Sequence, residues 1–190
     1  MQLLVGGDGC VSQAELLKEI KRKISLLDRT LLISIDGPAG AGKTTLATTI
    51  ANTFSNCHII HMDDLYRGWV LTLGPNLTRE LISILEQLEE SGKVSYTKFD
   101  WLTNSLGENC VISNPQILIL EGVGAGQKAI SSKIDIKVWV DIPYEIGLKR
   151  VLVRDGVGIK DEMERFLIEQ ATHFTAEETR ESSDFLIPGN

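Results

Sequence analysis

The chain has 190 residues, a length that suits one domain, residues 1–190, with a sizeable core. Its net charge of −7 disfavours sequence-independent binding to nucleic acid, and no apolar run is long enough to span a membrane. The cysteines, Cys10, Cys57 and Cys110, are too scattered for a disulfide framework or a zinc site. We therefore expect a cytoplasmic protein with no nucleic-acid or membrane partner.

Residues 1–29 read as a short glycine-rich arm followed by an amphipathic helix. Ser12 and Glu15 have the spacing of a capping box, which opens a helix. Apolar residues then fall on one face at helical spacing and basic residues lie largely opposite: Leu16, Leu17, Ile20, Ile24 and Leu27 against Lys18, Lys21, Arg22 and Lys23. Such a helix can lie on a membrane surface, but more often it packs on its own domain, which is what we expect.

The most informative stretch begins with an apolar run, residues 31–35, that predicts a buried strand of a parallel sheet. The pattern G-x-x-x-x-G-K-T follows, and a helix is predicted from Thr44 onward. A strand, a glycine loop and a helix in this order form a phosphate-binding loop. Its backbone N–H groups and the helix N-terminus would hold phosphate oxygens through Gly37, Ala39, Gly40, Ala41 and Gly42.

The side chains that close this loop have the chemistry of nucleotide binding. Lys43 can reach the β- and γ-phosphates of ATP, and the Thr44 hydroxyl is placed to ligate Mg²⁺. Thr45 would add a hydrogen bond near the α-phosphate. The sequence therefore predicts ATP and Mg²⁺ as cofactors.

A second apolar strand, residues 57–61, is followed by two carboxylates, Asp63 and Asp64. Ligands of open α/β sheets bind at the carboxyl ends of strands, so either carboxylate could accept the proton of a substrate hydroxyl. A solvated turn capped by aspartate is the alternative. His58 and His61 are three residues apart and would point to opposite faces, which argues against a shared metal site.

The middle of the chain predicts the acceptor side of a site. Tyr66 and Trp69 could stack on a base or simply pack. After a helix at residues 78–91, a hairpin is expected at 93–113, with 93–98 pairing with 109–113. This hairpin either builds an acceptor pocket or is purely structural. The third strand, residues 116–121, ends in Glu121, which could hold Mg²⁺ through water or orient the second substrate.

The last third predicts a fourth strand at 136–141, a helix running to Arg154 and a fifth strand at 183–189. Arg150 and Arg154 would share one face of that helix. Residues 155–174 are a candidate lid with glycine hinges. Its charge is unusual for closing over phosphates, because residues 155–181 hold eight acidic and three basic residues.

Five apolar strands alternating with helices predict an α/β fold with a doubly wound parallel sheet. At residues 30–190 the chain resembles the uridine kinase-like branch of P-loop kinases, the nucleoside kinase and phosphoribulokinase family. The resemblance is carried, in the family's order, by IDGPAGAGKTTLA, HMDDLY, YTKFDW, ILILEG, RVLVRD and SDFLIP.

This resemblance implies a three-layer P-loop NTPase fold with strand order 2-3-1-4-5, a small hairpin insertion and a lid segment. Asp63 would be the base that activates a 5′-hydroxyl. Tyr66, Phe99 and Asp100 would contact the acceptor nucleoside, and Glu121 would lie near metal and acceptor. Arg150 and Arg154 would touch the ATP phosphates or the adenine, and the implied metal set is Thr44, Asp63 and Glu121.

The predicted function is transfer of the γ-phosphate of Mg·ATP to a hydroxyl of a small molecule, with a pyrimidine nucleoside as the best candidate. The candidate lid lacks the arginine-rich character of the family, which keeps a second hypothesis open: an ATP-binding regulatory or assembly protein with little kinase activity. A third hypothesis retains the kinase but takes a sugar or vitamin-like alcohol as acceptor. A homo-oligomer is compatible with the sequence, which does not determine the oligomeric state.

Overall fold

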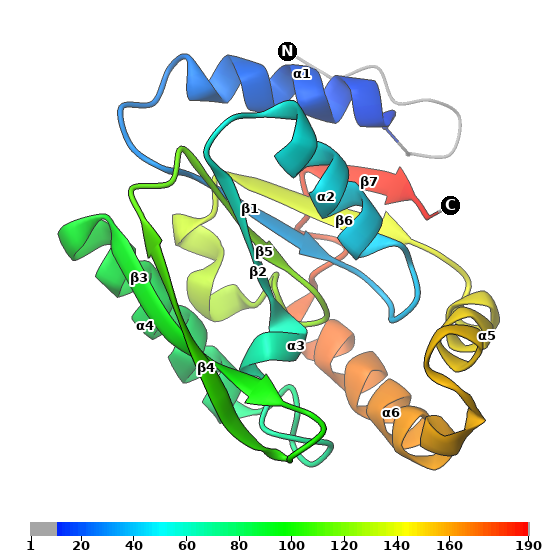
Figure 1. Ribbon diagram of the computed structural model, residues 1–190. Helices are drawn as coiled ribbons and strands as arrows, with labels where there is room; N and C mark the ends of the chain where they lie inside the picture. The colour runs from blue at the N-terminus through cyan, green and yellow to red at the C-terminus, as the bar shows by residue number, and fades with distance from the viewer. Residues whose placement is uncertain (1–10, 190) are drawn as a thin grey trace.

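The computed structural model describes residues 11–189 (Figure 1); the predicted arm at residues 1–9 lies outside them. A parallel sheet contains β1 (Leu31–Asp36), β2 (Cys57–His61), β5 (Ile117–Glu121), β6 (Ile136–Asp141) and β7 (Phe185–Pro188). The order across the sheet is β2-β5-β1-β6-β7. Numbered among themselves along the chain, these strands run 2-3-1-4-5, so the predicted α/β fold and strand order are confirmed.

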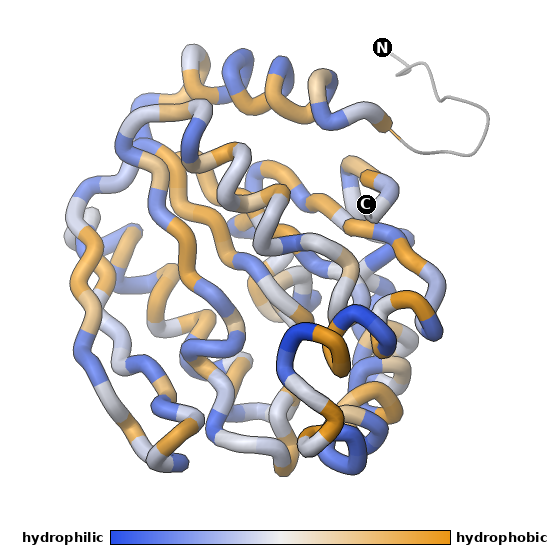
Figure 2. The backbone as a smooth tube through the Cα atoms, turned by 45° about the vertical axis from the view of Figure 1, so that its right-hand side comes forward, coloured by the Kyte–Doolittle hydropathy of each residue, from blue (hydrophilic) through white to orange (hydrophobic). Residues whose placement is uncertain are grey.

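The central strands are apolar because helices cover both of their faces. All residues of β1 and β5 are buried. Alternate residues of β1 enter different cores: Leu31, Ile33 and Ile35 pack with α1 and α2, whereas Leu32 packs with α4 and α6. Figure 2 shows the resulting pattern, with hydrophobic strands inside and hydrophilic stretches on the outer helices. The fold is therefore a three-layer sandwich.

On one face lie α1 (Gln13–Ile24) and α2 (Lys43–Thr53), and on the other α4 (Pro75–Ser91) and α6 (Lys160–Glu177). The capping box of Ser12 and Glu15 opens α1 as predicted, and Leu16 and Ile20 are fully buried against the sheet. The basic amphipathic helix thus packs on its own domain. No helix within residues 11–189 is long and apolar enough to cross a membrane.

The remaining elements are short or lie at the sheet edge. They comprise α3 (Met62–Leu65), α5 (Tyr144–Asp155) and two 3₁₀ segments, η1 (Lys128–Lys133) and η2 (Val157–Ile159). Helix α4 begins at Pro75, earlier than the predicted residue 78, because proline is well suited to the first turn of a helix. Helix α6 spans the second part of the candidate lid and extends beyond its predicted end.

A separate antiparallel hairpin is formed by β3 (Lys93–Asp100) and β4 (Ser105–Ser113). It is longer than the predicted pairing, because a register shift between Thr97 and Phe99 lets pairing resume at Phe99 with Leu106. Val94 and Tyr96 bury one face of the hairpin in the core that contains α4. The carboxyl ends of the parallel strands, the glycine loop and α3 meet at one edge of the sheet (Figure 1).

Candidate functional site

The glycine loop connects β1 directly to α2, with Gly42 as the N-cap residue and α2 beginning at Lys43, one residue before the predicted start. Inside the loop the Ala41 N–H donates to the Pro38 carbonyl at 3.1 Å. The Lys43 ammonium donates to the carbonyl oxygens of Gly37 and Pro38, each at 2.8 Å. Burial lowers the pKa of Lys43, and the charges of Glu121, Asp36 and Asp63 oppose that shift. The lysine is therefore held inside the loop, next to three carboxylates.

A close backbone contact fixes α5 against this loop. Gly40 has a left-handed φ of 75°, and a Cβ at this position would overlap the carbonyl group of Gly147 in α5. A Cβ on Gly147 would in turn overlap the carbonyl oxygen of Ala39. Glycine inside a helix is unfavourable by about 1 kcal/mol relative to alanine, so a specific contact is the reason to keep it. The two glycines let α5 approach the phosphate loop.

This approach brings the two predicted arginines to the loop. Arg150 donates from Nη1 to the Gly40 carbonyl at 3.3 Å. Arg154 makes two hydrogen bonds of 2.6 Å to Asp155. The charge of Arg154 also lowers the pKa values of Lys43 and Asp63. Arg150 thus contacts the phosphate loop, and Arg154 lies near enough to affect the pKa of Lys43. The roles of both arginines toward ATP stay predictions.

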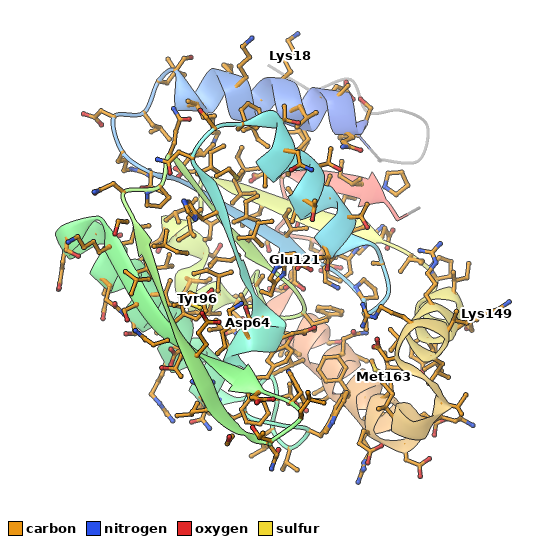
Figure 3. All side chains as sticks on the ribbon, viewed as in Figure 1. Lys18, Asp64, Tyr96, Glu121, Lys149 and Met163 are labelled. Carbon is orange, nitrogen blue, oxygen red and sulfur yellow. The ribbon has the colours of Figure 1, made fainter. Side chains whose placement is uncertain are left out.

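The two adjacent aspartates of α3 have different surroundings. Partial desolvation raises the pKa of Asp63, and Glu121 raises it further, while Lys43 and Arg154 lower it. Asp64 instead forms an ion pair with Lys98 of the hairpin, with 3.1 Å between Lys98 Nζ and Asp64 Oδ2. Figure 3 labels Asp64 on the hairpin side of α3 and Glu121 at the end of its strand. Of the two aspartates, Asp63 is therefore the one beside the charges of the phosphate loop.

Glu121 lies between the phosphate loop and β2. The Thr44 hydroxyl is 3.2 Å from each of its carboxylate oxygens. His61 Nδ1 is 2.7 Å from Glu121 Oε2, and this hydrogen bond raises the pKa of His61. Since β2 and β5 pair with His61 opposite Glu121, the register of the sheet brings the two side chains together.

These oxygen donors fit Mg²⁺. The ion is usually held by one or two carboxylates together with substrate phosphates and water, rather than by a complete protein cage. Thr44 and Glu121 offer a hydroxyl and a carboxylate 3.2 Å apart beside the loop. Within residues 11–189, no three His, Cys, Asp or Glu side chains form a metal-binding group of their own. The predicted role of Asp63 in binding the metal stays a prediction.

Two of the predicted acceptor residues, Tyr66 and Phe99, belong to an aromatic cluster, defined as Tyr66, Trp69, Phe99, Trp101 and Phe166. The Tyr66 hydroxyl donates to the Val123 carbonyl at 2.7 Å, and its ring is almost fully buried. Trp101 donates from Nε1 to the backbone carbonyl of Asp63 at 2.9 Å. The cluster therefore joins the hairpin, α3 and α6 beside the candidate base.

Within this cluster Tyr66 and Trp69 pack against other rings, which was one of the two alternatives from the sequence. Asp100, in contrast, accepts hydrogen bonds from the Leu102 and Thr103 N–H groups and so stabilises the turn of the hairpin. The predicted roles of Tyr66, Phe99 and Asp100 in binding an acceptor stay predictions.

Two further residues shape the site and were missed in the sequence. The buried Asp36 carboxylate accepts hydrogen bonds from the N–H groups of Gly37, Gly124 and Gly126, tying the phosphate loop to the loop after β5. A charged residue that ends an otherwise apolar strand was the available signal. Gln170 accepts from the Ala39 N–H at 2.9 Å, and no local pattern marks a glutamine on α6 as a neighbour of the phosphate loop.

The candidate lid contains both exposed and buried parts. Residues 155–158 are exposed, whereas Met163, Phe166, Leu167 and Gln170 are buried. The side of α6 that faces the phosphate loop is therefore packed in place. A closing motion of residues 155–174 stays a prediction.

Two surface cavities lie at the opposite, amino end of the sheet. One, of about 530 Å³, is lined by residues of α1 and the end of α2, including Leu17, Lys21 and Phe54. The other, of about 810 Å³, includes Arg29, Lys133 and Asp135. Neither of these two cavities is lined by a residue of the predicted site.

A parallel sheet of order 2-3-1-4-5, with a glycine loop between its central strand and a helix, defines a P-loop kinase fold. The solved structure of a possible uridine kinase from Bacillus stearothermophilus matches it with a TM-score of 0.64 and 20% identity, covering 91% of this chain and 99% of that one. At this identity the likeness shows the fold alone.

Sequence similarity to named kinases and to a family model shows the family of the chain. A uridine kinase of Clostridium tetani is 31% identical over 143 residues, which cover 67% of this chain and 68% of that enzyme. A cytidylate kinase of Methanococcoides burtonii is 28% identical over 142 residues, covering 75% and 73%. The model of the phosphoribulokinase / uridine kinase family matches residues 74–172.

The chain therefore belongs to the phosphoribulokinase / uridine kinase family, and it is a small-molecule kinase with a nucleotide-binding phosphate loop. The matched residues begin after the loop at residues 37–44, so the loop and the family model support this assignment independently.

Proposed function

We propose that this protein transfers the γ-phosphate of Mg·ATP to the hydroxyl of a pyrimidine nucleoside, with Asp63 as the base. The observation that carries the proposal is the placement of Asp63 in α3, directly after β2, where the charges of Glu121, Lys43 and Arg154 all affect the pKa of its carboxyl group. A carboxylate beside a phosphate loop is suited to accept the proton of an attacking hydroxyl.

In the proposed reaction, Asp63 accepts the hydroxyl proton as the substrate oxygen forms its bond to the γ-phosphorus. The bond from that phosphorus to the β,γ-bridging oxygen breaks, and ADP leaves. Lys43, which gives up its bonds to two loop carbonyls, and Arg150 and Arg154 would stabilise the charge on the transferring phosphoryl group. Mg²⁺ held by Thr44 and Glu121 would neutralise the phosphate oxygens.

The charges on the acceptor side favour a neutral alcohol over a phosphate-bearing acceptor such as cytidylate. A phosphate acceptor is already ionised at neutral pH, so it needs cationic contacts more than a base. Here Lys98 is paired with Asp64, and Arg67 lies 3.7 Å from Glu80. The cations near α3 thus have acidic partners, whereas a nucleoside offers a hydroxyl to Asp63 and a flat base to the aromatic cluster.

The proposal is tested by ADP release from Mg·ATP against a panel of acceptors: uridine, cytidine, cytidylate, sugars and vitamin-like alcohols. The Lys43→Ala variant gives the background. We expect strong acceptor-dependent release with uridine or cytidine. ADP release with only another alcohol would support the mechanism but contradict a nucleoside as the acceptor. ADP release with only cytidylate would contradict Asp63 as the general base. Tight ATP binding with no acceptor-dependent release would instead support the regulatory or assembly protein.

A further inference from the structure

His61 and Glu121 occupy opposite positions on neighbouring parallel strands. The register pairs five residues of β2 with five of β5, and His61 with Glu121 is the last pair, at the carboxyl end. Residues in register on adjacent strands point to the same side of the sheet. The 2.7 Å contact between His61 Nδ1 and Glu121 Oε2 follows from this register.

The direction of this hydrogen bond follows from its chemistry. An ionised carboxylate can only accept hydrogen bonds, so Nδ1 of His61 carries the hydrogen and donates it. The Glu121 side chain is 5% exposed and that of His61 is 37% exposed. The imidazole therefore lies between the buried carboxylate and solvent, with its donating nitrogen turned inward.

The bond restricts a carboxylate that would otherwise turn easily. The last side-chain torsion of glutamate is broad and has no sharp rotamer wells. Within residues 11–189, the other side-chain hydrogen-bonding partner of the Glu121 carboxylate is the Thr44 hydroxyl, at the longer distance of 3.2 Å from both oxygens. His61 adds a short hydrogen bond to Oε2 alone, so it makes the two oxygens inequivalent.

We propose that His61 is a positioning residue that orients the Glu121 carboxylate for the Mg²⁺ of the bound nucleotide. This inference rests on the proposed function, in which Thr44 and Glu121 hold that ion. With Oε2 engaged by His61, Oε1 is the oxygen left to face the metal. Hydrogen-bond partners of metal-ligating carboxylates commonly change metal affinity about 10- to 100-fold when they are removed.

The competing explanation is that the His61 bond only joins β2 to β5. The two strands are already paired over Cys57 to His61 and Ile117 to Glu121 by their backbones, without any help from side chains. A purely structural bond would affect stability and leave the metal dependence of nucleotide binding unchanged. The two explanations are therefore separated by a measurement of metal dependence.

The experiment uses calorimetric titration of the full chain with ADP, in EDTA and at a series of Mg²⁺ concentrations. His61→Leu removes the donor, and His61→Asn retains a donor N–H near the position of Nδ1. His58→Leu is the matched control, since His58 lies on the same strand and contacts Asn56 instead. We expect His61→Leu to reduce the Mg²⁺-dependent gain in ADP affinity about 10-fold, and His61→Asn to restore most of it. ADP affinity in EDTA should be unchanged in all variants.

Equal Mg²⁺-dependent gains in wild type and His61→Leu would overturn the positioning role and leave the proposed function standing. Failure of the wild type to bind ADP, or binding that survives Lys43→Ala unchanged, would overturn the proposed function and the His61 role together. Thermal unfolding without metal checks that each variant is folded. If His61→Leu is unfolded, the Mg²⁺-dependent gain in ADP affinity is measured with His61→Ala instead, which also lacks the donor.

Discussion

The buried lysine at the carboxyl end of the central sheet differs from the cations at the amino end in the partners that it binds. At the amino end, Arg29 makes two hydrogen bonds to Asp135, at 2.7 and 2.9 Å, and Lys133 is paired with Glu89. At the carboxyl end, the buried Lys43 is bonded to two backbone carbonyls, although Glu121 and Asp36 are close enough to affect its pKa. The amino-end cations are thus paired with carboxylates, whereas Lys43 lies near carboxylates and binds backbone carbonyls instead.

The difference separates stability from function. The ion pairs at the amino end contribute to the stability of the folded chain. Burying charges without direct pairing is costly, and such groups concentrate where a protein has chemistry to perform. We therefore expect substitutions at the carboxyl end to abolish activity at little cost in stability, and substitutions at the amino end to do the reverse.

The largest effect is expected from Asp63→Asn. Loss of a general base reduces turnover by about 10²- to 10⁴-fold, and ATP binding should survive because the phosphate loop is unchanged. Asp63 is exposed to solvent, but partial desolvation and the charge of Glu121 raise its pKa, so its charged form is not favoured by folding. The free energy of unfolding at pH 7 should accordingly stay equal or rise. Steady-state kinetics, ATP titration and urea unfolding measure the three quantities.

The same raised pKa fixes the direction of the pH dependence. Only the carboxylate form of Asp63 can accept a proton, so kcat should decline as the pH falls toward that pKa, which lies above the ordinary value of 3.8. Full activity of Asp63→Asn would show that another group is the base. It would also contradict the expectation that substitutions at the carboxyl end abolish activity.

A smaller effect, of the opposite kind, is expected from Asp135→Ala. The variant loses the Arg29 bonds and the bond from the Leu32 N–H, which should cost about 1 to 3 kcal/mol of unfolding free energy. Kinetic constants should stay at wild-type values, because Asp135 lies at the other end of the sheet from the phosphate loop. Chemical unfolding and the acceptor assay test both statements, and a loss of activity without a loss of stability would contradict them.

The pH dependence of this second effect has a definite sign. Burial raises the pKa of Asp135, but the bonds from Arg29 and the Leu32 N–H outweigh it and hold the pKa below its ordinary value. The stabilisation is therefore fully present above the ordinary aspartate pKa and is lost as the pH falls through the lower, folded value. Wild type and Asp135→Ala should become more alike in stability as the solution is acidified.

The smallest effect concerns Cys57, at the amino end of β2. Burial raises the pKa of this thiol to about 11, so at pH 8 only about one molecule in a thousand carries the reactive thiolate. Alkylation by iodoacetamide, followed by peptide mapping, should be slow at pH 8 and should accelerate as the pH rises. Unfolding in urea should remove the protection. Rapid alkylation in the native protein would show that burial at this end does not suppress reactivity.

Much of this architecture could be predicted because it depends on residues that are close together in the chain. The apolar strands predict a parallel sheet, and the glycine loop before Lys43 and Thr44 predicts phosphate binding, since both depend on neighbouring residues. The spacing of Arg150 and Arg154 predicts their common helix face for the same reason.

The contacts that could not be predicted depend on residues far apart in the chain. Gln170 reaches the Ala39 N–H across 131 positions, and His61 reaches Glu121 across 60. His61 could be excluded as a shared metal ligand with His58 from strand alternation, but its partner required the register of β2 with β5. The proposal of Asp63 rather than Asp64 as the base likewise depends on Lys98, which approaches Asp64 from the separate hairpin.

The facing glycines at positions 40 and 147 set the distance between the phosphate loop and α5 by the absence of two methyl groups. Any substitution at Gly147 must either distort the loop or displace the helix, and the helix carries both arginines with it. The lack of a side chain at Gly147 therefore determines how closely Arg150 and Arg154 can approach the phosphate loop. Along an evolutionary lineage, both glycines should be retained while α5 keeps this distance, because a Cβ at position 40 would overlap the Gly147 carbonyl group and a Cβ at position 147 would overlap the Ala39 carbonyl oxygen.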